Sequence, residues 1–178
     1  GQLGTEDCAS AGAANGARVV LLNAALAEAN WPLDLRGQEL VFQAGPQSEL
    51  PDTDNFREKM ITLSARALRP LAPVHPAASR EAGGVRLSWV RRTREGGDGW
   101  EGEAPLGEAF ERYRVSIFEG ETLLREVESL SSEYFYSDAE IETDFGPAGF
   151  GGAGDPAFAV AQVSDRVGPG VYARASLA

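Results

Sequence analysis

The sequence has 178 residues and a formal net charge of −11, from 27 acidic and 16 basic side chains. A surface of this charge repels nucleic-acid phosphates and anionic lipid headgroups, so we expect no nucleic-acid partner and no membrane insertion. The length is enough for two small domains, and the single cysteine, Cys8, excludes an internal disulfide and a cysteine zinc site.

The N-terminal stretch is rich in glycine and small polar residues. Residues 1–16 bury too little to offset the backbone entropy of folding, so we predict a loop or a frayed end. Because the chain opens on Gly1 and its only methionine is Met60, we expect it to be part of a longer polypeptide. The apolar run at 18–22 predicts a strand, while 23–29 fits either one helical turn or a second strand.

A small β domain is predicted over residues 17–70. Residues 40–43 form a short apolar run that ends at a Gly-Pro turn signal, and residues 60–64 alternate apolar and polar side chains. Pro70, Pro73 and Pro76 then fix φ and remove backbone donors, so this stretch is expected to be extended and to mark a domain boundary. A second domain is therefore predicted over residues 71–178.

The second domain shows a period-two pattern typical of strands with one buried face. The aromatic run at 133–137 predicts a further strand, and Gly120 marks a turn. Several short strands separated by turn signals predict a mostly β chain, in which the small β domain is followed by a fibronectin type III-like β-sandwich. The inward-facing positions are Val85, Leu87 and Trp89; Tyr113, Val115 and Ile117; and Phe158, Val160 and Gln162.

The stretch 149–154 matches the glycine spacing of dinucleotide-binding loops, but its surroundings do not fit. That motif follows a strand and opens a helix, whereas a β pattern comes directly after this glycine stretch. We therefore interpret it as a flexible loop between strands and expect no cofactor.

No catalytic or metal site is predicted. His75 is the only histidine, it lies between Val74 and Pro76, and no nucleophile stands near it in the sequence. Three groups of carboxylates were weighed as calcium ligands or as a glycosidase acid and base, but none has the spacing of a known calcium loop. We interpret them as solvated charge and expect a non-enzymatic protein. The groups are Asp52 and Asp54; Glu101 and Glu103; and Glu140, Glu142 and Asp144.

Aromatic side chains on loops are the candidate partner contacts. Trp89 lies in an alternating strand and is predicted to be core, whereas Trp100 lies in a glycine-rich loop and either contacts a partner or folds back. With Phe145 and Phe150, it is a candidate for stacking on a sugar or a protein. Separately, the basic residues at 91, 92 and 94 are expected to pair with glutamates on neighbouring strands.

Several motifs, in this order, resemble the C-terminal region of the large baseplate protein of gene transfer agents and related siphophages, nicknamed megatron. The opening residues 1–6 (GQLGTE) are also similar, and the likeness covers most of the chain from about residue 17 onward. The motifs are 68–75 (LRPLAPVH), 88–94 (SWVRRTR), 97–101 (GDGWE), 105–108 (PLGE), 111–115 (ERYRV), 160–164 (VAQVS) and 167–170 (VGPG).

The resemblance implies a structural component of the tail tip of a phage-like particle. It implies assembly with the hub, the distal tail protein and fibres, a homotrimer, and a contribution to host-cell contact, and no catalytic residue of the family falls in this segment. Two alternatives stay open: a receptor- or carbohydrate-binding module at the tail tip, or an accessory domain of an extracellular enzyme. Exposed loop aromatics at one end of the sandwich would favour the first alternative.

Overall fold

The computed structural model describes residues 11–21, 23–24, 26, 31–51, 53–97, 104–152 and 154–177. The chain divides between Ala67 and Leu68 into two units, which are described separately. Pro70 and Leu71 are buried and lie in the second unit, although the sequence boundary had been set between them. The second unit therefore begins before the proline cluster ends.

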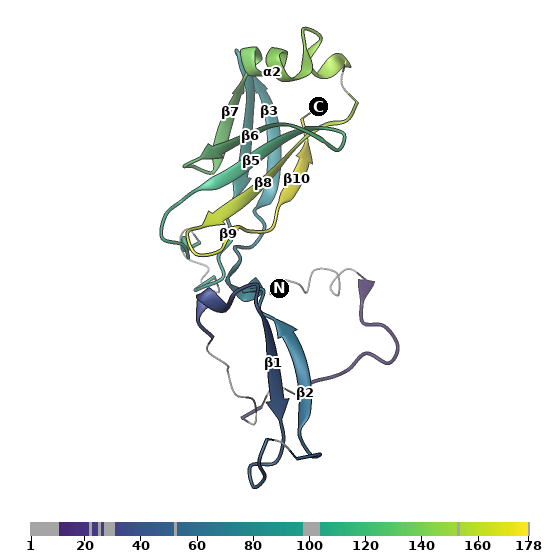
Figure 1. Ribbon diagram of the computed structural model, residues 1–178. Coiled ribbons are helices and arrows are strands. Elements are labelled where there is room, and N and C mark those ends of the chain that lie inside the picture. Colours follow the sequence, from purple (N-terminus) through teal and green to yellow (C-terminus); the bar gives the residue numbers. More distant parts are fainter. Residues whose placement is uncertain are drawn as a thin grey trace. The chain divides into compact units, whose positions relative to one another are not determined.

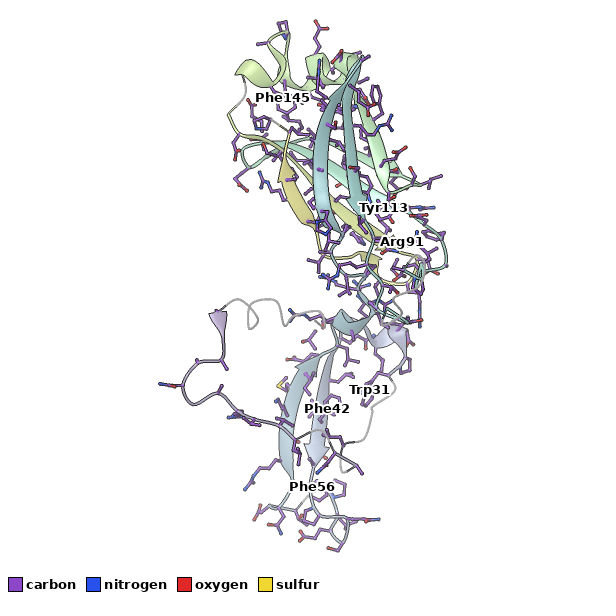
Figure 2. The ribbon with its side chains drawn as sticks, turned by 180° about the vertical axis from the view of Figure 1, so that it is seen from behind. Trp31, Phe42, Phe56, Arg91, Tyr113 and Phe145 are labelled. Carbon is purple, nitrogen blue, oxygen red and sulfur yellow. The ribbon has the colours of Figure 1, made fainter. Side chains whose placement is uncertain are left out.

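The first unit is built on a two-stranded antiparallel ribbon of β1 (Glu39–Ala44) and β2 (Arg57–Thr62) (Figure 1). Two 3-10 turns, η1 (Leu33–Leu35) and η2 (Arg66–Leu68), flank it in sequence. Trp31 packs edge-on against Phe42 on one face, with ring centroids 5.1 Å apart (Figure 2). On the other face, Val41 and Met60 lie opposite each other and remain 58% and 61% exposed.

The strands expected at 40–43 and 60–64 correspond to β1 and β2, but the strand expected at 18–22 was wrong over its described part. Residues 18–21 form no strand, and Val19 is 96% exposed. A strand needs a neighbour to accept its backbone hydrogen bonds, and none of the described segments pairs with these residues. Further on, Asn23 and Ala24 form a turn rather than a helix or a strand. Most of the loop predicted over 1–16 falls on residues 1–10, which lie outside the described residues.

The second unit is a fibronectin type III-like β-sandwich of two antiparallel sheets (Figure 1). One sheet has the order β3-β4-β7, and the other has the order β10-β8-β5-β6, with the short β9 paired to β8. The strands are β3 (Val74–Glu81), β4 (Gly84–Val90), β5 (Tyr113–Glu119), β6 (Thr122–Ser129), β7 (Glu133–Ser137), β8 (Pro156–Ser164), β9 (Gly168–Pro169) and β10 (Ala173–Ser176).

Most of the core of the sandwich comes from positions that the period-two pattern predicted, and Tyr136, Ile141 and Leu177 add to it. Alternate side chains of β4, β5 and β8 point between the sheets and are almost completely buried, which confirms the expected inward faces. Trp89 packs edge-on against Tyr113, with ring centroids 5.2 Å apart. The buried cluster comprises Val85, Leu87, Trp89, Tyr113, Val115, Ile117, Tyr136, Ile141, Phe158, Val160 and Leu177.

The connection from β7 to β8 contains the one α-helix of the described sandwich residues, α2 (Asp138–Phe145), and a 3-10 turn, η3 (Gly149–Gly152). The glycine pattern at 149–154 predicts a loop between strands. The glycine stretch is instead partly helical, and it is preceded by a helix and followed by β8. A dinucleotide loop needs a strand before it and a helix after it, so this order is the reverse of that arrangement.

Candidate partner-binding site

Helix α2 begins with a capping box that the sequence contains as Ser137-x-x-Glu140. The Ser137 hydroxyl accepts a hydrogen bond from the Glu140 backbone N–H, and the Glu140 carboxylate accepts one from the Ser137 backbone N–H at 2.9 Å. Gly146, with φ +78°, follows the last helical residue, and such a left-handed φ suits glycine and ends the helix. Local sequence alone therefore sets both ends of α2.

A network around Arg125 of β6 ties the helix to the sandwich. Its guanidinium group makes a two-bond contact with Asp144, at 2.6 and 3.0 Å, and a longer contact of 3.4 Å with Glu140. The hydroxyl groups of Tyr134 and Tyr136 donate to Glu140 and Asp144, each at 2.7 Å. We call these five residues the Arg125 network. It joins β6, β7 and α2.

The network changes the titration of its members. Burial acts to raise the pKa of Glu140, but hydrogen bonds from Tyr134 and Ser137 outweigh it and hold this pKa below its usual value. Burial also raises the pKa of Tyr136, and the hydrogen bond to Asp144 raises it further. The hydrogen bond with Asp144 raises the pKa of Arg125. Both tyrosines of the network therefore stay protonated and act as hydrogen-bond donors at neutral pH.

We expect the stability of the sandwich to fall as the pH drops below the pKa that Glu140 has in the unfolded chain. Glu140→Gln should reduce this loss of stability. A carboxyl group whose pKa is lowered by folding stabilises the folded state above its unfolded pKa of 4.5 and loses that contribution as the pH falls through the folded value. The measurement is the urea midpoint between pH 3 and 7, with the exposed Glu142→Gln as control. Parallel pH profiles for Glu140→Gln and the parent would contradict the expectation.

The carboxylates at 140, 142 and 144 do not form the solvated run that the sequence analysis assumed. Because a helix places residues four apart on one face, Glu140 and Asp144 turn together toward Arg125, and the side chain of Asp144 is only 7% exposed. Glu142 points to solvent. Within the described ranges, no group of three or more histidine, cysteine or acidic side chains could hold a metal ion.

Phe145 and Phe150 lie at the helix-bearing end of the sandwich, where Figure 2 labels Phe145. Both rings are half-buried and pack against the core, with their centroids 5.1 Å apart, and Phe150 lies 6.4 Å from the ring of Tyr136. They therefore close this end of the core while keeping part of each ring accessible. Trp100, the third residue of the candidate set, lies outside the described residues. Contact of these aromatics with a partner stays a prediction.

A surface groove of about 520 Å³ runs beside α2, and we call it the α2 groove. Its lining comes from α2, from the glycine-rich connection that follows and from Arg80 at the end of β3. A volume of this size falls in the range of sites that hold small ligands or a few side chains. The residues are Arg80, Asp138, Ile141, Glu142, Gly146, Pro147, Ala148, Gly149 and Phe150.

The long connection from β4 to β5 is held by ion pairs at both of its described ends. Arg91 donates twice to the Ala104 carbonyl, at 2.9 and 2.8 Å, and lies 3.4 Å from the Glu111 carboxylate. Arg94 pairs with Glu108 at 2.9 Å, and the Glu108 side chain is only 5% exposed. Among the described residues, the expected pairing with glutamates is confirmed for Arg91 and Arg94 but not for Arg92, and both partners lie within the loop rather than on neighbouring strands.

His75 lies on β3 and is exposed, with φ +52°, between two paired positions where the register with β4 shifts. Such a bulge interrupts the edge of a sheet and discourages pairing with another strand. We therefore interpret His75 as part of a bulge in the edge strand β3.

No family model and no curated protein matches the sequence. Among solved structures, the chain is similar to domains d3–d4 of the rat CD45 extracellular region, with a TM-score of 0.36 and 11% sequence identity, over 92% of this chain and 77% of that one. A likeness this distant carries no argument about function. In the described part of the chain, no helix is both long and apolar enough to cross a membrane.

Proposed function

We propose that this chain is a structural module of the tail tip of a phage-like particle. It acts by holding a rigid sandwich and its loops in an assembly, and it carries out no chemistry. In this proposal its partners are the hub, the distal tail protein and fibres, and it is present as a homotrimer. The proposal rests on the ordered motifs that resemble the C-terminal region of the megatron-type baseplate protein.

One observation supports this proposal most: residues of the separate motifs hold one another in the fold. The Gln162 side chain donates to the Leu106 carbonyl at 3.3 Å, and the Val163 backbone N–H donates to the Arg112 carbonyl at 2.8 Å. These bonds join the motif at 160–164 to those at 105–108 and 111–115. Three motifs of the resemblance thus meet in one sandwich.

The first and last motifs of the sandwich are also joined. The Gly170 backbone N–H donates to the Gln162 carbonyl at 2.9 Å, and the Val171 N–H donates to the Pro70 carbonyl at 3.2 Å. Pro70 packs so closely on Gly170 that a Cβ atom there would overlap its carbonyl oxygen. The Val-Gly-Pro-Gly turn therefore fixes the point where the chain enters the sandwich. Such contacts fix the geometry of the module, as an assembly role requires.

Deletion of residues 68–178 from the gene that encodes this chain tests the proposed role. We expect particles whose tail tips are incomplete by electron microscopy and whose attachment to recipient cells is lost. The matched control is Asp165→Asn, at an exposed turn after β8, which leaves the fold unchanged. Intact tips with undiminished attachment would contradict the proposal. Intact tips with lost attachment would favour a receptor- or carbohydrate-binding module instead.

A further inference from the structure

The α2 groove combines an apolar base with an open rim. Ile141 belongs to the buried core and is only 5% exposed, and the half-buried Phe150 lies beside it in the lining. Gly146 has no heavy atom within 4 Å of the position where a Cβ would stand, so its backbone borders open space. Apolar side chains of another molecule can therefore pack on the exposed part of Phe150 and on the edge of Ile141 that lines the groove, without moving the backbone.

The charges at the groove favour a cationic occupant. Arg125 neutralises Glu140 and Asp144 on the inner face of α2, and Arg80 pairs with Asp138 at 2.7 Å. Glu142 remains exposed, and no described residue makes a hydrogen bond or an ion pair with its carboxylate. It is the carboxylate of the lining that is left uncompensated.

The helix itself adds to this negative potential. Its last turn contains no basic residue, so no side chain of α2 compensates the negative end of the helix dipole next to Gly146. The Glu142 carboxylate and the carboxyl end of α2 both attract a basic side chain. The apolar base beside them suits an apolar side chain on the next residue of the same partner segment. An anionic or purely apolar occupant would leave one of these features unpaired.

We propose that the α2 groove binds a short extended segment of a partner protein in which an arginine or lysine stands next to a large apolar residue. The apolar side chain packs on Ile141 and Phe150, and the basic side chain reaches Glu142 and the carboxyl end of α2. The volume of about 520 Å³ fits a segment of a few residues. This inference holds for any parent assembly and does not rest on the proposed tail-tip function.

The test titrates the isotope-labelled protein with a capped tetrapeptide of alternating arginine and leucine, and follows the backbone amide signals by NMR. We expect a Kd of about 1 mM or tighter, with the largest shifts at Glu142, Gly146 and Gly149. Glu142→Arg should weaken binding about tenfold, because it removes the attraction and adds a repulsion. The matched control, Asp165→Arg, makes the same charge change on the exposed turn at the other end of β8 and should leave the Kd unchanged.

Two further peptides complete the design: one with glutamate for arginine and one with glycine for leucine. Both should bind at least about fivefold more weakly if charge and apolar contact act together. Equal weakening by Glu142→Arg and Asp165→Arg, with shifts spread over the acidic surface, would overturn the proposal in favour of nonspecific attraction. Equal binding of the glutamate peptide, or no shifts up to about 5 mM, would overturn it as well. Correct folding of both variants is read from the same spectra.

Discussion

We expect Trp89→Ala to lower the free energy of unfolding of the sandwich by about 3 to 5 kcal/mol, the usual cost of removing a large aromatic from a core. Trp89 is 4% exposed and packs against Tyr113 between the two sheets. The alanine side chain would leave a cavity that the strands on either side cannot close without breaking their pairing. Urea unfolding followed through the amide signals of β8 measures the loss in the sandwich alone.

Trp31→Ala is the matched control for this change. Trp31 lies in the first unit, is 46% exposed and packs on Phe42 of the ribbon, so its loss should leave the unfolding of β8 unchanged. A loss below about 1 kcal/mol for Trp89→Ala would show that the site collapses around the missing ring and that the core is less tightly packed than described.

The second large effect is expected at Arg125. Replacing it by methionine keeps most of the side-chain volume but leaves the Asp144 carboxylate, which is only 7% exposed, without its cation. Removing one partner of a buried ion pair is more costly than removing both, and we expect a loss of about 2 to 3 kcal/mol, reduced from the fully buried case because Arg125 is 24% exposed. The same urea experiment measures it.

A double-mutant cycle separates the ion pair from the packing of the arginine stem. Asp144→Asn removes the charge while an amide oxygen can still accept the Tyr136 hydroxyl, so the double variant should recover part of the loss. We expect a coupling energy of about 1 to 3 kcal/mol between residues 125 and 144. Strictly additive losses would mean that Arg125 contributes through its aliphatic stem and not through the network.

The strands that could be predicted from the sequence are those whose alternation reflects a buried face. Trp89, Tyr113 and Phe158 each lie in such a pattern, and each is buried. The edge strand β3 carries little apolar alternation, because only one of its faces meets the core and part of that face is small or charged. Residues 74–81 therefore form a strand because they pair with β4, and their own side-chain pattern does not predict one.

The helix-bearing end of the sandwich is harder to predict from the sequence, for a physical reason. Helix α2 has only Ile141 and Phe145 as large apolar residues, so its periodicity is weak, although the capping box at Ser137 and Glu140 was readable. The Arg125 network joins residues from β6, β7 and α2, and its partners meet only after the sheets form. Glu140 and Asp144, which have the sequence pattern of solvated charge, therefore pair with a single arginine in the folded chain.

The central position of β8 also has a consequence for folding during synthesis. This strand pairs with both β5 and β10, and the pairing of Tyr113 with Gln162 joins residues that are far apart in the sequence. Such long-range pairing slows folding, because the intervening loop must be closed before the contacts form. Until residues 156–164 leave the ribosome, the edge of β5 that later pairs with β8 has no partner strand. During synthesis the growing chain is therefore most exposed to association with other chains just before its last long strand arrives.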